Sequence, residues 1–318
     1  MLRLLDKRLL FVTGKGGVGK TTVATALGLA AARRGLRTIV CEVSQQERMP
    51  QVFRREGVGY SETELAPNLF GMSVDPQLAL EEYLIDQTGS ARLGGLLAGN
   101  RIFEYFVAAA PGVRELATIG KVWELAQPTR RNPEASPYDV VIVDAPATGH
   151  GVGLLKTPNT YRDVARVGPI RRQAGHIRDF LRDPDSTAVL AVALAQEGPV
   201  AETLELAAEL GGLEMPVQAV IVNELLPERF AREEAKELAA VADRDGSPKV
   251  AGALQAALSE HHRARSQRTQ LRRLRRELDR VVTLPFIWEA ELDLEAFGRL
   301  AAELDRKLFA ADAVGART

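Results

Sequence analysis

The sequence has few of the features that mark secreted, disulfide-bonded or membrane-spanning chains. Its 318 residues include one cysteine, Cys41, which excludes a disulfide framework or a multi-cysteine metal site built by this chain alone. No uncharged apolar run approaches the ~20 residues that a membrane span needs. Residues 1–8 carry charges where a signal peptide would be apolar. We therefore expect no membrane span and a cytoplasmic, reducing location.

An excess of charge of one sign is missing as well. The chain has 41 Lys and Arg against 42 Asp and Glu, a net charge of −1, which argues against a broad nucleic-acid surface. Arginines gather between His261 and Arg280, but no Phe, Tyr or Trp lies among them for base stacking, so a solvated helix face is favoured. His261 and His262 lack partners at metal-ligand spacing, and we expect both at the surface.

The chain does contain a series of short runs rich in Val, Ile and Leu, with helical stretches between them. These runs are residues 8–13, 37–43, 69–74, 138–144, 187–194, 217–222 and 280–284. Such alternation is typical of a parallel sheet covered by helices on both faces. The predicted fold is α/β, a doubly wound, mostly parallel sheet, in a single domain spanning 1–318.

Two long stretches are helical in pattern and lack a strand candidate. We interpret residues 77–127 and 153–182 as helical additions at one end of the sheet. Their apolar residues either pack the additions on the sheet or line a surface groove, and the sequence leaves both alternatives open. Those of the first addition include Leu93, Leu96, Leu97, Ile102, Phe103, Tyr105, Phe106 and Val107.

A glycine-rich loop follows the first predicted strand and precedes a predicted helix that starts at Lys20 and stops before Gly35. It fits G-x-x-x-x-G-K-[ST], whose backbone N–H groups turn onto phosphate oxygens at a helix N-terminus. Lys20 would reach the β- and γ-phosphates, and the Thr21 hydroxyl would bind Mg²⁺. The predicted nucleotide-binding residues here are Gly14, Gly16, Gly17, Val18, Gly19, Lys20, Thr21 and Thr22. The alternative, a glycine turn without a ligand, is disfavoured by this context.

Polar residues end two other predicted strands. Asp144 closes the strand at 138–144 and is placed to hold Mg²⁺ through its water shell. Asn223 follows the strand at 217–222, at the edge of a doubly wound sheet where ligands bind. Asn223 is either a nucleotide contact or a turn residue that ends the strand.

The second lysine of the loop, Lys15, gives it the form K-G-G-x-G-K-T-T. This resembles the deviant Walker A loop of a P-loop ATPase class that includes the ParA/MinD proteins and the ArsA-like ATPases. The stretch D-A-P-A-T-G-H from Asp144 to His150 resembles the switch segment D-T-A-P-T-G-H of the ArsA-like branch. Further matches to that branch lie at 67–76, 111–115, 202–203, 222–223 and 284–285. ParA/MinD proteins lack the segment around Asp75, so the ArsA-like branch is favoured.

The resemblance implies an ATP- and Mg²⁺-dependent ATPase that works as a homodimer or as a heterodimer with a related ATPase. It implies that Lys15 crosses the dimer interface to the partner's nucleotide, the alternative being a lysine solvated on the loop. It also implies that Asn223 reads the adenine edge and that the loop after Pro285 packs on the base. Lys15, Lys20 and Asp144 are the predicted catalytic residues, whereas His150 is favoured as structural.

The sequence departs from the family at the second strand, where members place a catalytic Asp. Ser44 occupies the aligned position, and a hydroxyl cannot take a proton from water at neutral pH. Glu42 and Glu47 are the nearby candidates to substitute for it. The chain is therefore predicted to bind ATP well and to hydrolyse it slowly, or to be the weak half of a heterodimer. A nucleotide-gated scaffold with little hydrolysis is the alternative to an ATPase.

The resemblance leaves the client unidentified. Family members that target membrane proteins hold a transmembrane helix in a Met-rich groove, but this chain has only four methionines, and none lies in the helical additions. Its lone Cys41, in a predicted buried strand, argues against the multi-cysteine metalloid site of arsenite pumps. We therefore expect a protein client, whose identity the sequence does not reveal.

Overall fold

The computed structural model describes residues 4–43, 47–88, 112–164, 168–242, 247–289 and 291–309. Its strands are β1 (Leu9–Gly14), β2 (Thr38–Glu42), β3 (Thr63–Ala66), β4 (Leu69–Ser73), β5 (Val140–Asp144), β6 (Thr187–Leu194), β7 (Val217–Leu225) and β8 (Val281–Pro285). They form one sheet in the order β3-β4-β2-β5-β1-β6-β7-β8. Every pairing is parallel except that of β3 with β4. The predicted fold class is confirmed.

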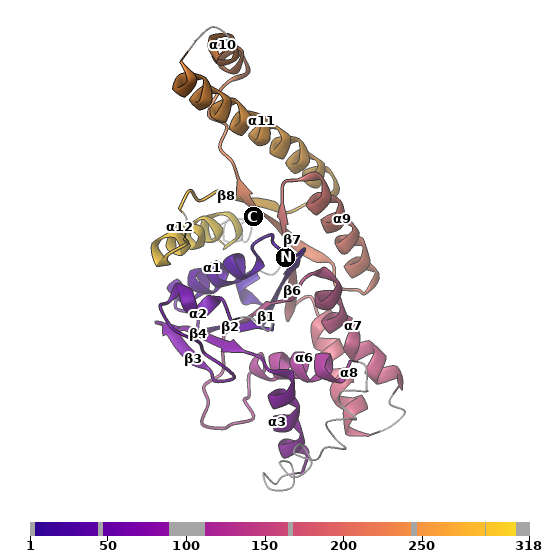
Figure 1. Ribbon diagram of the computed structural model, residues 1–318. Coiled ribbons are helices and arrows are strands. Elements are labelled where there is room, and N and C mark those ends of the chain that lie inside the picture. Colours follow the sequence, from indigo (N-terminus) through magenta and orange to yellow (C-terminus); the bar gives the residue numbers. More distant parts are fainter. Residues whose placement is uncertain are drawn as a thin grey trace, which may run out of the picture.

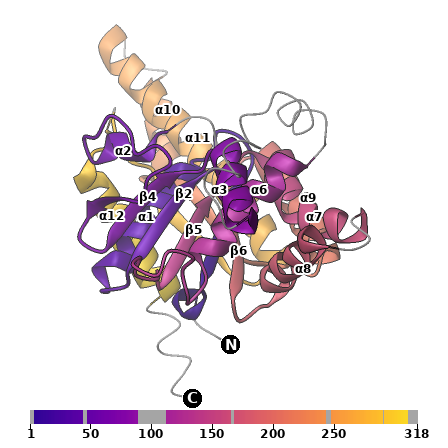
Figure 2. The ribbon, with the colours of Figure 1, turned by 90° about the horizontal axis from the view of Figure 1, so that it is seen from below.

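The helices cover both faces of this sheet (Figures 1 and 2). They are α1 (Lys20–Arg33), α2 (Met49–Val52), α3 (Pro76–Thr88), α6 (Val113–Leu125), α7 (Thr148–Val164), α8 (Pro169–Arg182), α9 (Glu197–Gly212), α10 (Arg232–Ala242), α11 (Pro248–Glu277) and α12 (Leu294–Leu304). Helices α1 and α12 pack on one face, and α6 to α9 with the end of α11 pack on the other. Within the described residues, no helix is long and apolar enough to cross a membrane.

The central strand β1 shows why the strands read as continuous apolar runs. All of its residues are buried. Leu9 and Phe11 join the core on the α6–α9 face, whereas Leu10 and Val12 join the core on the α1 face. A strand covered by helices on both sides has no solvent-facing side, so its sequence shows no alternation of apolar and polar residues. Six further strands were predicted from the same signal.

Strand β3 was missed. Its sequence, TELA, contains no Val or Ile, and none of its residues is buried. It pairs antiparallel with β4 at the sheet edge through a turn in which Asn68 has a positive φ of 63°. An edge strand stabilised by one neighbour needs few apolar residues. A search for runs of Val, Ile and Leu therefore does not detect it.

The two stretches interpreted as helical additions hold four described helices. Residues 77–127 include most of α3 and all of α6, while 153–182 include most of α7 and all of α8. They were expected at one end of the sheet, whereas α6, α7 and α8 bury Ile119, Leu155 and Ile177 in the core of one sheet face. Residues 89–111, with the apolar residues singled out above, lie outside the described part of the chain.

Helices α10 and α11 form an arm that extends away from the sheet, at the top of Figure 1. The last turns of α11 return to the core through Leu271 and Leu274. The prediction that His261 lies at the surface was wrong: it is 6% exposed, with its ring 6.4 Å from that of Phe230. The imidazole ring packs against Phe230, which lies in the segment before α10. His262 is exposed as predicted.

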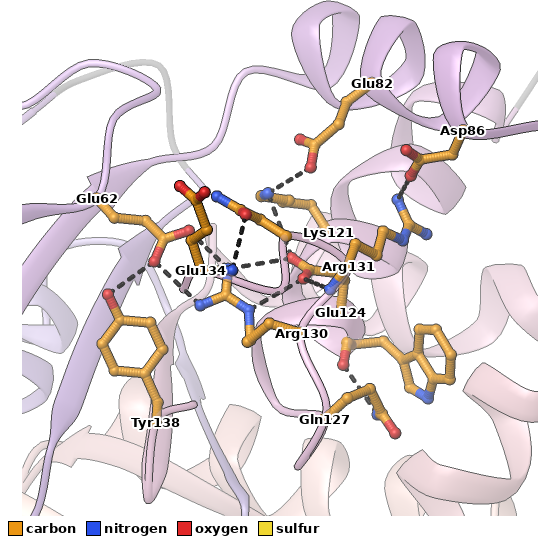
Figure 3. Close-up of polar contacts among 12 residues, drawn as sticks. Glu62, Glu82, Asp86, Lys121, Glu124, Gln127, Arg130, Arg131, Glu134 and Tyr138 are labelled. Atoms are coloured by element: carbon orange, nitrogen blue, oxygen red, sulfur yellow. Dashed lines mark hydrogen bonds and ion pairs between the residues drawn. The ribbon is translucent and has the colours of Figure 1, made fainter. Parts of the chain in front are cut away.

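A buried ion-pair network joins the β3 edge to α6 (Figure 3). Arg130, whose side chain is 3% exposed, donates hydrogen bonds to Glu62 at 2.6 and 3.1 Å and to Glu124 at 3.0 Å. The Tyr138 hydroxyl donates to Glu62 at 2.8 Å, and Lys121 lies 3.3 Å from Glu124. The network therefore fastens the edge of the sheet to the helix that covers it.

Candidate functional site

The predicted phosphate-binding loop lies between β1 and α1, and its glycines are sterically required. Gly14, Gly17 and Gly19 have φ values of 146°, 81° and 89°. A Cβ atom on Gly14 would clash with the Val192 carbonyl oxygen, and one on Gly19 would clash with the Asn223 amide. Gly17 is exposed and meets nothing within 4 Å. The loop leads directly into the N-terminus of α1, the end of a helix at which backbone N–H groups can bind an anion.

Lys20, Thr21 and Asp144 are brought together at the carboxyl ends of β1 and β5. The Thr21 hydroxyl donates to Asp144 Oδ2 at 2.6 Å, and Lys20 Nζ donates to the Lys15 carbonyl oxygen at 3.0 Å. Asp144 is 2% exposed. Burial raises its pKa to about 6, although the Thr21 hydroxyl and the Lys20 charge act in the opposite direction. Burial lowers the pKa of Lys20.

These residues fit a magnesium ion. Asp144 Oδ1 is buried and has no hydrogen-bond partner among the described residues. An unsatisfied buried carboxylate oxygen is costly unless a cation or a donor meets it. Together with the Thr21 hydroxyl it supplies the hard oxygen donors that Mg²⁺ prefers. In the described ranges, no group of three or more His, Cys, Asp or Glu residues gathers to hold a metal ion, so the protein donors for Mg²⁺ here are Thr21 and Asp144.

Lys15 turns away from the loop towards α9. Its ammonium forms an ion pair with Glu202, and both side chains are close to 40% exposed: 43% for Lys15 and 38% for Glu202. A pair this open to solvent contributes little to stability and breaks easily. In the isolated chain, therefore, Lys15 is held in cis by a weak contact rather than lying over its own phosphate site.

Asn223 and Pro285 lie at the ends of neighbouring strands. Asn223 is 4% exposed, and its amide nitrogen donates to the Val18 carbonyl oxygen of the loop at 3.1 Å. The donor half of the amide thus fixes the loop. Pro285 is exposed at the end of β8. Beyond it, Phe286 and the 56% exposed Trp288 stack edge to face at 4.8 Å. The sequence predicted a role for the loop after Pro285 but did not single out these two rings. The available signal was the presence of two aromatic residues two positions apart in that loop.

Near the carboxyl end of β2, the two carboxylates that could substitute for the family's catalytic Asp, Glu42 and Glu47, have different environments. Ser44 lies outside the described residues. Glu47 accepts backbone hydrogen bonds from Val58 and Gly59, each at 3.0 Å, so it clamps the chain before β3. Glu42 is fully buried, and burial raises its pKa to about 7. His150 is exposed near the start of α7.

Comparison with known proteins agrees with this geometry. The family described as anion-transporting ATPases, the ArsA ATPases, matches residues 7–173 and 166–244. The ATPase BagA of Mycobacterium tuberculosis is 33% identical over 246 residues, covering 76% of this chain and 71% of the relative. The ATPase GET3 of Kluyveromyces lactis is 27% identical over 254 residues, covering 69% and 72%. A putative arsenical pump-driving ATPase of Halobacterium salinarum is 26% identical, covering 71% of this chain and 36% of its own length.

A mostly parallel sheet with a glycine-rich loop between β1 and α1, next to a buried carboxylate at the end of β5, defines the fold of the P-loop nucleoside triphosphatases. Within that class, the chain belongs to the family of ArsA-like ATPases. The predicted family is confirmed. Its members are ATPases, which agrees with the predicted general kind of reaction.

Proposed function

We propose that this chain binds ATP with Mg²⁺ and hydrolyses it as a dimer, and that the nucleotide state controls handling of a protein client. The observation that carries the proposal is the contact between Thr21 and Asp144 beside Lys20. A hydroxyl, a carboxylate with an unpartnered oxygen and a lysine lie together beside the glycine-rich loop. That set of groups suits a nucleoside triphosphate and its metal.

Each residue has a separate task in this proposal. The loop amides and Lys20 bind and orient the phosphates, while Thr21 and Asp144 hold Mg²⁺, which neutralises charge on the phosphates when bound. Asn223 keeps the loop in shape through Val18. Lys15 leaves Glu202 and reaches the partner's nucleotide, where it stabilises charge developing on the transferred phosphoryl group.

The helices after Asp144 are the proposed link to a client. Asp144 ends β5, and α7 begins four residues later at Thr148. A shift of the intervening loop on binding or release of the γ-phosphate would move α7 and the helix that follows it. The arginine-rich arm is proposed as a solvated helix face, with no nucleic-acid role.

A second candidate is a nucleotide-gated scaffold that hydrolyses little ATP. Two observations favour it. Ser44 replaces the expected catalytic carboxylate, and Lys15 is held by Glu202 of its own chain. In this case ATP binding alone drives dimer formation, either between two copies or with a related ATPase.

Nucleotide-dependent association, measured together with phosphate release, separates these candidates. We expect a monomer without nucleotide and a dimer with ATP, because Lys15 gains a partner phosphate only across an interface. Size-exclusion chromatography with mass detection, with ATP, with ADP and without nucleotide, measures this alongside phosphate release. Dimerisation without release favours the scaffold, whereas a monomer under every condition contradicts the role given to Lys15.

Restoring the family carboxylate tests the slow-hydrolysis hypothesis. Ser44→Asp is expected to raise the turnover rate by about 10²-fold or more, because a carboxylate can orient and deprotonate water where a hydroxyl cannot. Steady-state phosphate release is the measurement, with Ser44→Asn as the uncharged control. An unchanged rate in Ser44→Asp would count against the idea that position 44 limits hydrolysis.

A further inference from the structure

Glu42 is a second buried carboxylate beside Asp144. It is the last residue of β2 and lies in register with Asp144, the last residue of β5. Neighbouring strands lie about 4.8 Å apart, and residues in register share a face of the sheet. Glu42 contacts the start of α2, and Asp144 contacts α1. Both carboxylates therefore lie at the same strand ends, on the face of the phosphate-binding loop.

Only half of the Glu42 carboxylate has a structural task. Its Oε1 atom accepts backbone hydrogen bonds from Arg48 at 2.9 Å and Met49 at 3.1 Å, which holds the first turn of α2. Its Oε2 atom is buried without a partner among the described residues, as is Oδ1 of Asp144. Two neighbouring carboxylates thus each present an unsatisfied oxygen, an arrangement that costs free energy unless something with hydrogen-bond donors or positive charge meets both.

The other carboxylates near this edge are occupied. Glu47 is bound by the amides of Val58 and Gly59, and Asp75 caps α3 through the amides of Gln77 and Leu78 at 2.8 and 3.0 Å. Among the described residues between β2 and α3, Glu42 is the carboxylate with an unpartnered buried oxygen at the site. It also stands two residues before Ser44, where the family's carboxylate is missing.

We propose that Glu42 is a positioning residue of the Mg²⁺·ATP site, whose Oε2 atom accepts a hydrogen bond from water bound to the ion that Thr21 and Asp144 hold. A bound divalent ion offsets the charge of both carboxylates, and its waters supply the donors that the two oxygens lack. This inference rests on the proposed function, because it assigns another residue to the same site.

The test is the Mg²⁺ dependence of nucleotide binding by the full chain. Glu42→Gln keeps an oxygen for the Arg48 and Met49 amides and removes the charge and the second acceptor. The Mg²⁺ concentration that half-saturates the fluorescence change of N-methylanthraniloyl-ADP is expected to rise about 10- to 100-fold, the usual cost of losing an outer-sphere partner. Binding of the same analogue in EDTA is expected to change less than about threefold. Glu47→Gln, the matched control, should leave both values near those of the wild type.

Three outcomes would contradict the proposal. If Glu42→Gln binds the analogue with wild-type Mg²⁺ dependence, or if Glu47→Gln weakens it equally, Glu42 has no such role. If the wild type binds no nucleotide, or if its nucleotide affinity does not depend on Mg²⁺, the proposed function itself is contradicted. The role given to Glu42 is then contradicted as well.

Discussion

Lys15→Ala is expected to lower ATP turnover by about 10³-fold or more while leaving nucleotide binding by the monomer nearly unchanged. Cations supplied in trans to a transferred phosphoryl group contribute rate effects of about 10³–10⁵. Nucleotide binding by the monomer is expected to change little because Lys15 pairs with Glu202 in the isolated chain and so does not contact the nucleotide of its own chain. Single-turnover phosphate release is followed over hours, so that the much slower rate of the variant can also be measured. Equilibrium binding of a fluorescent ATP analogue gives the affinity.

The matched control is Lys156→Ala. Lys156 also forms an exposed ion pair with a glutamate of α9, Glu209, at 2.5 Å, and both of these side chains are 45% exposed. It lies outside the proposed site, so its loss is expected to leave turnover unchanged. A fall in rate equal to that of Lys15→Ala would assign the effect to the α9 surface instead.

Mixing variants tests action in trans. A Lys15→Ala chain keeps its own loop, Thr21 and Asp144, whereas an Asp144→Asn chain keeps Lys15. A mixed dimer therefore contains one complete site, and phosphate release is expected to recover on mixing. No recovery, in a mixture shown by mass to form dimers, would mean that Lys15 acts within its own chain.

Arg130→Met is expected to lower the free energy of unfolding by about 3–5 kcal/mol, the cost of leaving buried partner charges uncompensated. Glu124, with a side chain 3% exposed, would keep only Lys121 as a cation, and Glu62 would keep only the Tyr138 hydroxyl. Urea denaturation followed by circular dichroism measures the change. Arg131→Met is the control: Arg131 pairs with Asp86 at 2.6 Å where the two side chains are 29% and 36% exposed, and its loss is expected to cost at most about 1 kcal/mol.

The effect of Arg130→Met is expected to depend on pH. Burial by itself raises the pKa of Glu62 and Glu124, but hydrogen bonds from Arg130 bring both below their usual value of 4.5. A lowered pKa in the folded state means stability that is present above pH ~4.5 and is lost as the pH falls through the folded-state value. The difference between wild type and Arg130→Met should therefore be full at pH 7 and shrink in acid. A difference that stays constant down to pH ~3 would contradict the role of these carboxylates.

The fold was largely predictable because its signals are local. A strand buried on both faces must be a run of Val, Ile and Leu, and a helix that ends at Arg33 is followed by Gly35 with a φ of 85°. The edge strand β3 escaped prediction because pairing with one neighbour requires no apolar sequence. Burial of His261 escaped prediction because it depends on packing against Phe230, a residue 31 positions away in the sequence, and not on spacing along α11.

The candidate site divides in the same way. The loop from Gly14 to Thr21 is contiguous, and its glycine positions express backbone requirements that any P-loop shares. The contact between Thr21 and Asp144 joins residues 123 positions apart, yet it was predictable because β1 and β5 end at one edge. The states of Glu42, Glu47 and Lys15 were not, because each depends on which amide, carboxylate or open space the fold places beside it.

By itself the sequence determined the class of fold, the position of the glycine-rich loop and the family. These reside in short contiguous patterns whose residue types are set by backbone geometry and by burial. Only the tertiary structure decided which carboxylate near β2 has an oxygen to offer. Glu42 and Glu47 are equivalent in a sequence, but amides from Val58 and Gly59 use both oxygens of one, while the sheet buries the other beside Asp144 with one oxygen unpartnered. Hydrogen-bond satisfaction is a property of neighbours in space.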